Sequence, residues 1–300
     1  MYKFSIIIPH RNIPSLLRRC LDSIPHRDDV QIIVVDDNSD ADKVDFSKFP
    51  GLNEKNTEVY FTKEGKGAGY ARNVGLKHAK GEWLLFADAD DMFMKEVDLV
   101  LEHVCHSASD IIFFLSKALN AKDLSPVKSQ SYVSYINELL REYENTPNQI
   151  RGLVQVPWGK VIRRNFLSKN NILFEETKYA NDVRFSAYSD YYAKVVEIFP
   201  VEAYCYMVRS DSLWHNRNLE WAKVRFGVSL RIAKFYKKRD IYKQRMEFTN
   251  TALFFLYRIK EFSLFHFYIA LIRYVLFTGI KKEYINSAIK KIKRKFFRCK

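Results

Sequence analysis

Strongly apolar runs alternate with segments of helical apolar spacing over the first 115 positions. The apolar runs, each long enough for a buried strand, are Phe4–Pro9, Gln31–Val35, Val59–Thr62, Trp83–Ala87 and Ile111–Leu115. The segments with helical spacing are residues 15–24, 70–79 and 97–104, and Ser15 is expected to cap the first of these helices. Strands that alternate with helices in this way predict an α/β fold with a doubly wound, mostly parallel sheet.

Acidic residues directly follow two of the predicted strands. They are Asp36 and Asp37 after the second run and Asp88, Asp90 and Asp91 after the fourth. The carboxyl ends of parallel strands share one edge of a sheet, and ligands of open α/β sheets bind there. Two carboxylates spaced Asp-x-Asp can share a hard divalent cation such as Mg²⁺ with its substrate. The alternative for such aspartates is a helix cap.

The composition describes a folded protein of a reducing compartment. Of the 300 residues, 47% are hydrophobic and 15% aromatic, which argues against disorder. The four cysteines lie far apart and form no CxxC pair, so neither a zinc site nor a disulfide framework is expected. Residues 1–9 are strand-like and too short for a signal peptide, which predicts a cytoplasmic location.

The net charge of +14 is unevenly distributed along the chain. Residues 221–300 contain 21 basic and 4 acidic residues, a net charge of +17, so the rest of the chain carries −3. A nucleic-acid-binding body is not normally slightly acidic. The asymmetry predicts instead a catalytic body with a basic anchoring segment.

Three segments occur in an order and spacing that identify a family. They read FSIIIPHRN at residues 4–12, IIVVDDNSD at 32–40 and GAGYARNVGLKHAKGEWLLFADADD at 67–91. Together they resemble inverting family-2 glycosyltransferases of the GT-A fold. PWGKVIRRNFL at 157–167 and FEETKYANDVRFS at 174–186 resemble the acceptor-side half of the same family. The resemblance spans about residues 4–215, and the last 85 residues carry no motif of the family.

The resemblance implies an activity and a division of the chain. The activity is metal-dependent transfer of a sugar, with inversion, from a nucleotide-diphosphate-sugar, here a UDP-sugar, to a hydroxyl group of a glycan or lipid-linked glycan. Such transfer serves cell-surface polysaccharide or glycolipid synthesis, with Mn²⁺ or Mg²⁺ as cofactor. A GT-A catalytic domain is expected over residues 1–215, with 1–115 binding the nucleotide-sugar and 116–215 serving the acceptor. Residues 216–300 then form a basic, aromatic helical extension.

The resemblance assigns the nucleotide base to the ends of the first two strands. Asp37 is expected to accept a hydrogen bond from N3–H of the base, while Asp36 holds the loop. The alternative for this pair is an Asx turn after the strand. Pro9 and Arg11 are expected to line the base pocket. Many relatives have an aromatic residue at the position of Arg11, and a guanidinium group can also stack on a base.

The glycine-rich segment before the second helix is expected to bind the diphosphate. Gly67 and Gly69 allow close approach of the backbone, and Arg72 offers charge-assisted hydrogen bonds. The dipole at the start of the following helix also favours phosphate. The alternative is an ordinary flexible turn.

The family pattern separates the three aspartates after the fourth strand. Asp88 is expected to contact the ribose or the donor sugar, and Asp90 to coordinate the metal that bridges the two phosphates. A metal at that place neutralises the charge that develops on the leaving diphosphate. Asp91 is expected to cap the following helix.

The general base is expected at the start of a later helix. Inverting transfer needs a carboxylate that removes the proton of the attacking hydroxyl. The family carries this base in a Glu-Asp or Asp-Asp pair, and here the matching pair is Asn181-Asp182, so we predict Asp182 as the base. The alternative is a helix N-cap, with Glu175 or Glu176 as substitute bases.

One aromatic and one imidazole side chain are further candidate site residues. Trp158 is predicted to form a platform for the acceptor sugar, and its alternative is a buried core residue. His215 is a candidate additional metal ligand, although a lone histidine is usually structural.

The C-terminal segment predicts attachment to a membrane surface without spanning it. Residues 253–280 are densely apolar, but charged residues interrupt every long window. Residues 281–300 form a basic amphipathic tail, which is typical of contact with anionic lipid on the cytoplasmic face. The alternatives are a helix packed on the enzyme body or a simple solvated basic face.

Two other functions compete with this interpretation. A nucleotidyltransferase also uses aspartates on an α/β sheet, but its glycine-rich loop would follow the first strand, where this chain has PHRNIP. A nucleic-acid-binding protein would use the basic tail, but the chain lacks a DNA or RNA motif, so no nucleic-acid partner is expected.

Overall fold

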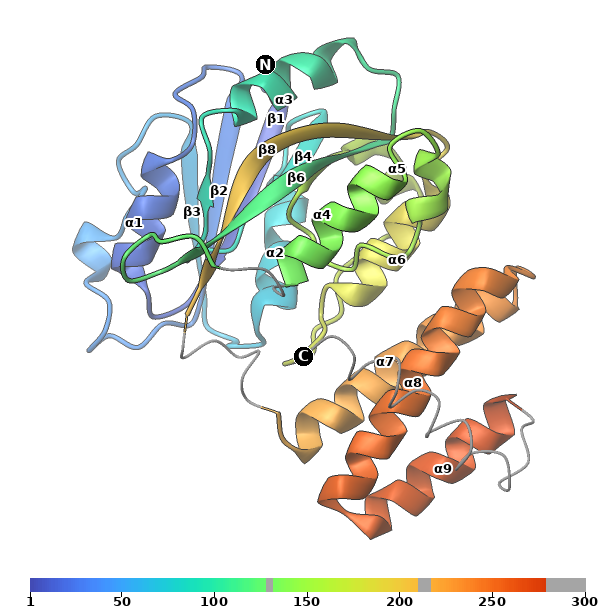
Figure 1. Cartoon of the computed structure of the whole chain (residues 1–300). Coiled ribbons are helices and arrows are strands. Elements are labelled where there is room, and N and C mark those ends of the chain that lie inside the picture. Colours follow the sequence, from blue (N-terminus) through green and yellow to red (C-terminus); the bar gives the residue numbers. More distant parts are fainter. Residues whose placement is uncertain (128–131, 210–216, 279–300) are drawn as a thin grey trace. The chain divides into compact units, whose positions relative to one another are not determined.

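The computed structural model describes residues 1–127, 132–209 and 217–278 (Figure 1). The chain divides into two compact units, residues 1–209 and 210–300. The functional division expected at residue 215 remains a prediction.

An eight-stranded sheet in the order β3-β2-β1-β4-β7-β6-β8-β5 forms the centre of the first unit. Its strands are β1 Phe4–His10, β2 Val30–Asp37, β3 Thr57–Thr62, β4 Trp83–Phe86, β5 Met92–Phe93, β6 Ile111–Asn120, β7 Lys160–Arg163 and β8 Val196–Val208. β3, β2, β1 and β4 are parallel neighbours, and β6 pairs in parallel with β8. β5 and β7 pair antiparallel with their neighbours. The predicted mostly parallel α/β sheet is confirmed.

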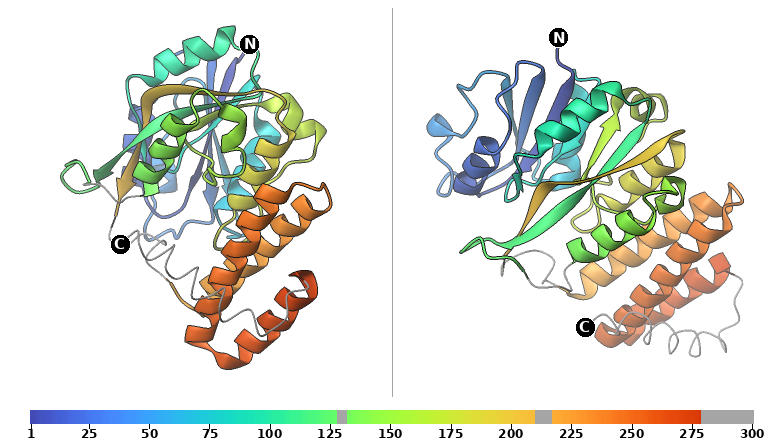
Figure 2. Two further views of the ribbon diagram at one scale, coloured as in Figure 1. Left: turned by 45° about the vertical axis from the view of Figure 1, so that its right-hand side comes forward. Right: turned by 45° about the horizontal axis from the view of Figure 1, so that its top comes forward.

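Helices and two short 3₁₀ turns pack along this sheet (Figure 2). The helices are α1 Pro14–Asp22, α2 Ala68–His78, α3 Val97–His106, α4 Tyr132–Glu142, α5 Arg164–Lys169 and α6 Val183–Tyr192, and the 3₁₀ turns are η1 Phe46–Lys48 and η2 Pro147–Ile150. α2 contacts β1 and β2, whereas α4 contacts β6. The prediction that Ser15 caps α1 is wrong, because the helix begins at Pro14 with Ile13 at the N-cap position. Proline suits this first position, where its missing N–H has no helical partner.

The register of the parallel strands places the ends of β1, β2 and β4 next to one another. His10 lies opposite Asp36 across β1 and β2, and Ile7 lies opposite Phe86 across β1 and β4. Every residue of β1 and β4 is buried, and acidic residues occur at the end of β2 and directly after β4. The two acidic strand tips therefore lie at one edge of the sheet, as predicted.

The second unit contains three helices in its described part, α7 Leu219–Lys237, α8 Tyr242–Phe262 and α9 Leu264–Thr278. α7 and α8 lie side by side (Figures 1 and 2). Aromatic contacts join them, with Trp221 edge-on to Phe255 at 5.1 Å between ring centres. The predicted C-terminal helical extension is confirmed. Within the described residues, no helix combines the length and the apolar character needed to cross a membrane.

Candidate active site

Arg72 connects two parts of the predicted site. From α2 it forms an ion pair with the carboxylate of Asp88, after β4, and donates a hydrogen bond of 2.9 Å to Oδ1 of Asn181. Arg72 is 4% exposed, and its guanidinium carbon lies 5.3 Å from the ring centre of Phe174. Two predicted donor-site residues are therefore in direct contact, and the same arginine reaches the residue that precedes Asp182.

Asp90 lies on the turn after β4, with its side chain 31% exposed. Its Oδ2 accepts a hydrogen bond from Arg209 at 3.2 Å, and its backbone carbonyl accepts one from Arg19 at 2.8 Å. Partial burial, followed by the negative charge of Asp88, raises the pKa of Asp90. Both causes act against a second negative charge at this strand tip.

The donor chemistry of this strand tip suits a divalent cation. Across residues 1–127, 132–209 and 217–278, no three His, Cys, Asp or Glu side chains form a ready metal cage. Mg²⁺-like ions are often held by only one or two carboxylates, with water and substrate phosphates completing the shell. Asp90 with Asp88 supplies such oxygen donors, and a cation would relieve their mutual repulsion. His215, the additional candidate ligand, lies outside the described residues.

The expectation that Asp91 caps the following helix is wrong. Asp91 is 1% exposed, and α3 begins six residues later with Glu96 at its N-cap position. The carboxylate of Asp91 accepts hydrogen bonds from the Tyr204 hydroxyl at 2.7 Å and from the Met207 N–H at 2.8 Å. Burial, then the charges of Asp90 and Asp88, raise its pKa well above the usual range. Asp91 therefore anchors the acidic turn to β8.

Asp37 binds the glycine-rich segment before α2. Its two carboxylate oxygens accept hydrogen bonds from the backbone N–H groups of Lys66, at 3.1 Å, and Gly67, at 2.6 Å. The segment predicted to bind diphosphate is therefore tied to the residue predicted to bind the base. Both ligand roles remain predictions.

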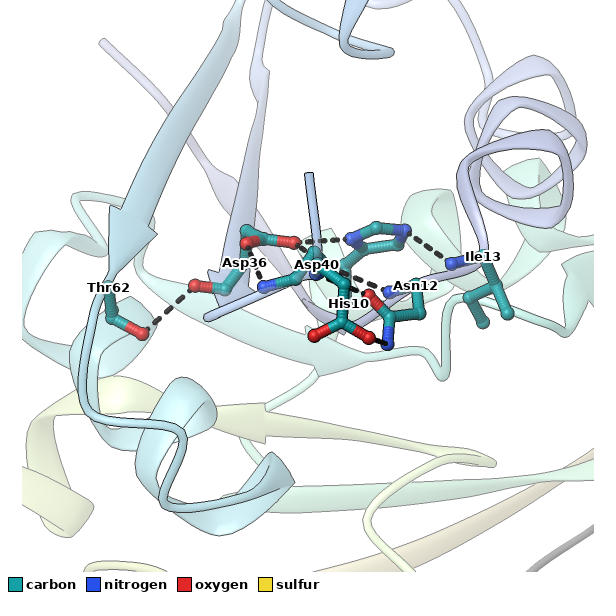
Figure 3. A network of polar contacts seen from close by, with 7 residues as sticks. His10, Asn12, Ile13, Asp36, Asp40 and Thr62 are labelled. Carbon is teal, nitrogen blue, oxygen red and sulfur yellow. Dashed lines mark hydrogen bonds and ion pairs between the residues drawn. The ribbon is translucent and has the colours of Figure 1, made fainter. Parts of the chain in front are cut away.

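Asp36 holds the loop that follows β2, as predicted. Its carboxylate binds the ring of His10 (Figure 3). It also accepts hydrogen bonds from both the N–H and the hydroxyl of Ser39. Burial opposes the negative charge, but the hydrogen bonds from His10 and Ser39 outweigh burial and lower the pKa of Asp36.

Gly69 has a packing role that the sequence did not reveal. A Cβ atom at this position would lie 2.1 Å from the carbonyl oxygen of Glu175 and 2.9 Å from Cβ of Asn181. Only glycine lets the first turn of α2 approach the 175–181 segment this closely. Gly67, directly before α2, has φ +93°, a left-handed conformation that favours glycine.

Asp182 is half-buried and occupies the N-cap position of α6. Its side chain makes no capping hydrogen bond to the first turn of α6, which lies entirely within the described residues. Glu175 is buried, and its Oε1 lies 3.4 Å from Nη1 of Arg184. Glu176 is exposed. The geometry therefore does not support the capping alternative for Asp182, and its role as the base remains a prediction.

The remaining candidates differ in exposure. Pro9 is buried within β1, and Arg11 is exposed on the loop that follows, beside Gly65. Trp158 is 4% exposed, and its ring stacks on Tyr204 and Tyr206 at 5.5 and 5.6 Å between centres. This placement favours the core alternative for Trp158 over an acceptor platform.

β8 contributes residues to the site that the sequence did not indicate. Tyr204 donates to Asp91 and accepts the N–H of Asp88 at 3.0 Å, and Arg209 follows the end of the strand. The available signal was the alternation of aromatic residues at positions 204 and 206, which is typical of a half-buried strand. Its pairing with the acidic turn depends on tertiary contacts.

Comparison with known proteins identifies the family. The family model described as Glycosyl transferase family 2 matches residues 5–169, more than half of the chain. This chain belongs to glycosyl transferase family 2. Among its family-2 relatives is the poly(ribitol-phosphate) beta-N-acetylglucosaminyltransferase TarS of Staphylococcus aureus (strain MW2), 28% identical over 219 residues. That match covers 70% of this chain and 36% of TarS, so the chain spans about a third of the length of this relative.

Two solved structures show the fold of this family-2 chain. S. aureus TarS 1-349 in complex with UDP-GlcNAc matches with a TM-score of 0.63 and 22% identity, covering 99% of this chain and 81% of TarS 1-349. Mannosyltransferase PcManGT from Pyrobaculum calidifontis, in complex with GDP-Man and Mn²⁺, matches with a TM-score of 0.53 and 14% identity. That match covers 97% of this chain and 84% of PcManGT. The GT-A fold expected from the resemblance is confirmed.

Proposed function

We propose that this chain transfers a sugar, with inversion, from a UDP-sugar to a hydroxyl group of a glycan, polyol-phosphate or lipid-linked acceptor. The observation that carries the proposal is the Asp88–Arg72–Asn181 connection, which joins the donor-side strand tip to the residue beside the predicted base. The UDP-GlcNAc bound by TarS supports a UDP-sugar donor, and the name of TarS supports an acceptor of the poly(ribitol-phosphate) class. Such a reaction belongs to the synthesis of cell-surface polymers.

The donor side of the proposed site is the edge formed by β1, β2, β4 and the start of α2. Arg11 and Asp37 contact the base, with Pro9 forming the pocket wall. Gly69 and Arg72 contact the diphosphate, where the N-terminus of α2 adds a favourable dipole. Asp88 binds hydroxyl groups of the ribose or the donor sugar, and its contact with Arg72 fixes its orientation.

The acceptor side supplies the base. Asp182 takes the proton from the acceptor hydroxyl as that oxygen attacks from the face opposite the leaving diphosphate. A divalent cation held by Asp90, when bound, neutralises the charge that develops on the diphosphate. The Mn²⁺ in the complex of PcManGT supports this cofactor class.

We also propose that the C-terminal extension attaches the enzyme peripherally to the cytoplasmic face of a membrane. Residues 221–300 carry a charge of +17, which favours anionic lipid. Six large apolar side chains on α9 are 46–80% exposed: Leu264, Phe265, Tyr268, Ile269, Ile272 and Leu276. Side chains from other positions of the same helix are buried, including Phe267, Leu271 and Tyr274. An apolar face combined with basic residues is typical of helices that lie in the lipid interface.

A donor screen tests the proposed activity. Release of the nucleoside diphosphate is measured for UDP- and GDP-sugars, with and without Mn²⁺, in the presence of poly(ribitol-phosphate). We expect release from a UDP-sugar that requires both Mn²⁺ and acceptor. If no nucleotide-sugar is consumed and no nucleoside diphosphate binds, the proposed function is wrong.

A further inference from the structure

His10 is a buried polar residue that the transfer reaction does not explain. It is the last residue of β1, is 2% exposed and lies opposite Asp36 in the register of β1 and β2. Its Nδ1 is 2.7 Å from Oδ1 of Asp36, and its ring packs edge-on against Phe49 with centres 5.0 Å apart. Figure 3 shows the His10 ring between the carboxylate of Asp36 and the backbone nitrogen of Ile13.

The surroundings of His10 select one protonation state of its ring. The backbone N–H of Ile13 points at Nε2 from 3.1 Å. Because a backbone N–H can only donate, Nε2 must be the unprotonated nitrogen. Nδ1 then carries the proton, and this N–H donates a hydrogen bond to Oδ1 of Asp36. With both nitrogens engaged, the ring cannot bind a metal or act as a base without breaking one of these bonds.

The same network connects the two loops that follow β1 and β2. Asp36 accepts the N–H of Ser39 at 2.9 Å and its hydroxyl at 2.5 Å, and the Ser39 oxygen accepts the N–H of Asn12 at 2.8 Å. The side chain of Asn12 donates to the carboxylate of Asp40 at 2.8 Å and accepts the backbone N–H of Asp40 at 2.7 Å (Figure 3). These bonds fix residues 10–13 against residues 36–40.

The clamped loops carry the residues proposed to contact the base. Arg11 lies within the first loop, and Asp37 lies between two members of the network, Asp36 and Ser39. Asn12 and Asn38 have φ of +60° and +57°, left-handed conformations that need local support. A change in the His10–Asp36 contact would therefore displace Arg11 and Asp37 together.

We propose that His10 is a positioning residue of the nucleotide pocket. In its neutral form, protonated on Nδ1, it links Asp36 to the N–H of Ile13 and so sets the two loops that carry Arg11 and Asp37. This inference rests on the proposed function, because the ligand that it positions is the uridine nucleotide of the donor.

The experiment compares His10→Asn with a matched control, Ser5→Ala. The amide introduced by His10→Asn can still donate toward Asp36 but is too short to accept from Ile13. Ser5 forms a comparable buried contact nearer the start of β1, with its hydroxyl 2.6 Å from the side-chain oxygen of Gln31 across the same two strands. Ser5→Ala therefore weakens the same strand pair without touching the two loops. UDP binding to the full chain is measured by calorimetry, together with kcat and the KM values of donor and acceptor.

We expect His10→Asn to weaken UDP binding and raise the donor KM by roughly tenfold, the scale of a buried donor left unsatisfied. The acceptor KM and kcat at saturating donor should change little, whereas Ser5→Ala should lower the melting temperature and leave UDP affinity unchanged. UDP affinity that is the same in His10→Asn and the wild type would overturn the inference. An equal loss of affinity in Ser5→Ala would also overturn it, because the effect would then be general destabilisation.

A spectroscopic measurement on the wild type does not depend on how the variants fold. Nitrogen-15 NMR of labelled histidines distinguishes a ring protonated on Nδ1 from the other neutral form and from the charged ring. We expect the Nδ1-protonated signature for His10 at neutral pH, and either other signature contradicts the inference. If the wild type shows the expected signature but binds no UDP, the proposed function fails, and with it the nucleotide role of His10.

Discussion

Asp182 occupies the N-cap position of α6, directly before Val183, and makes no capping hydrogen bond to the first turn of the helix, which the structure describes in full. An aspartate at this position normally accepts a hydrogen bond from a backbone N–H two or three residues later. Its neighbour Asn181 accepts from Arg72, which holds Asp88. Asn181 therefore connects to the strand tip proposed to bind the donor, and Asp182 directly precedes α6.

We expect Asp182→Asn to retain UDP binding and to lower turnover by at least about 100-fold, the scale of a positioned general base. The amide has nearly the same shape as the carboxylate but cannot accept the proton. Glu176→Gln, the same change on an exposed carboxylate of the approaching segment, should leave turnover near the wild-type value. Near-normal turnover in Asp182→Asn would move the role to Glu175 or Glu176.

Asp90 should govern metal-dependent binding. In Asp90→Ala the Mn²⁺-dependent part of UDP affinity should fall by at least about tenfold, since charge stabilisation by such an ion is worth several kcal/mol. Calorimetry with and without Mn²⁺ measures this part directly. Asp42→Ala removes an exposed carboxylate from the loop that follows β2 and serves as the control. Equal metal-dependent affinity in both variants would exclude Asp90 as the ligand.

At the level of elements, a buried ion pair ties α6 to β7 and to the segment before it. Lys160 and Asp190 have fully buried side chains with Nζ and Oδ1 3.8 Å apart. Lys160 donates to the carbonyl of Val154 at 3.2 Å, and Asp190 accepts the N–H of Gly152 at 2.9 Å. Burial lowers the pKa of Lys160 and raises that of Asp190, while their mutual attraction opposes both shifts. The pair therefore helps to set the place of the helix that begins after Asp182.

Removing one partner of this pair should cost more than removing the charge of both. Lys160→Met leaves Asp190 buried without its counter-ion, and we expect a loss of about 3–5 kcal/mol in the free energy of unfolding. The double variant Lys160→Met with Asp190→Asn keeps an acceptor for Gly152 and should recover part of that loss. Urea denaturation measures both. A double variant that is less stable than Lys160→Met would show that the ion pair is not the source of the effect.

The elements that the sequence predicted correctly are those with strong local signals. β1, β2, β4 and β6 are apolar runs, and α2 ends at His78, one residue before the predicted end at residue 79. β5 has only two residues, and β7 and β8 become strands through pairing with residues far away in the chain. Local periodicity does not show which distant strands pair with one another. For the same reason the anchoring of Asp91 by Tyr204, 113 positions later, was not predictable.

The whole molecule combines a slightly acidic body with a strongly basic C-terminal part. Attraction of basic residues to an anionic surface adds about 1 kcal/mol for each residue near the lipid and is screened by salt. The apolar side chains exposed on α9 add a contribution that salt does not weaken. These two contributions can be separated experimentally.

We expect the full chain to sediment with vesicles containing anionic phosphatidylglycerol at low salt, and less with neutral phosphatidylcholine vesicles. Deleting residues 281–300 removes nine basic residues and should weaken this binding by at least about tenfold. Phe265→Glu with Ile272→Glu should weaken it as well, whereas Tyr242→Glu, at an exposed aromatic on α8, should not. UDP binding should be unchanged in all three variants. A full chain that stays in the supernatant with anionic vesicles at low salt would refute the attachment.

The contact between Gly69 and Glu175 has a mechanical consequence. At this point the first turn of α2 meets the 175–181 segment backbone to backbone, with no side chain between them that could change rotamer. We therefore expect a small displacement of α2 to shift the segment that leads into Asp182. The start of α2, proposed to bind the diphosphate, and Asp182, the proposed base, are linked through this close backbone contact. We therefore expect nucleotide binding at the start of α2 to influence the orientation of Asp182.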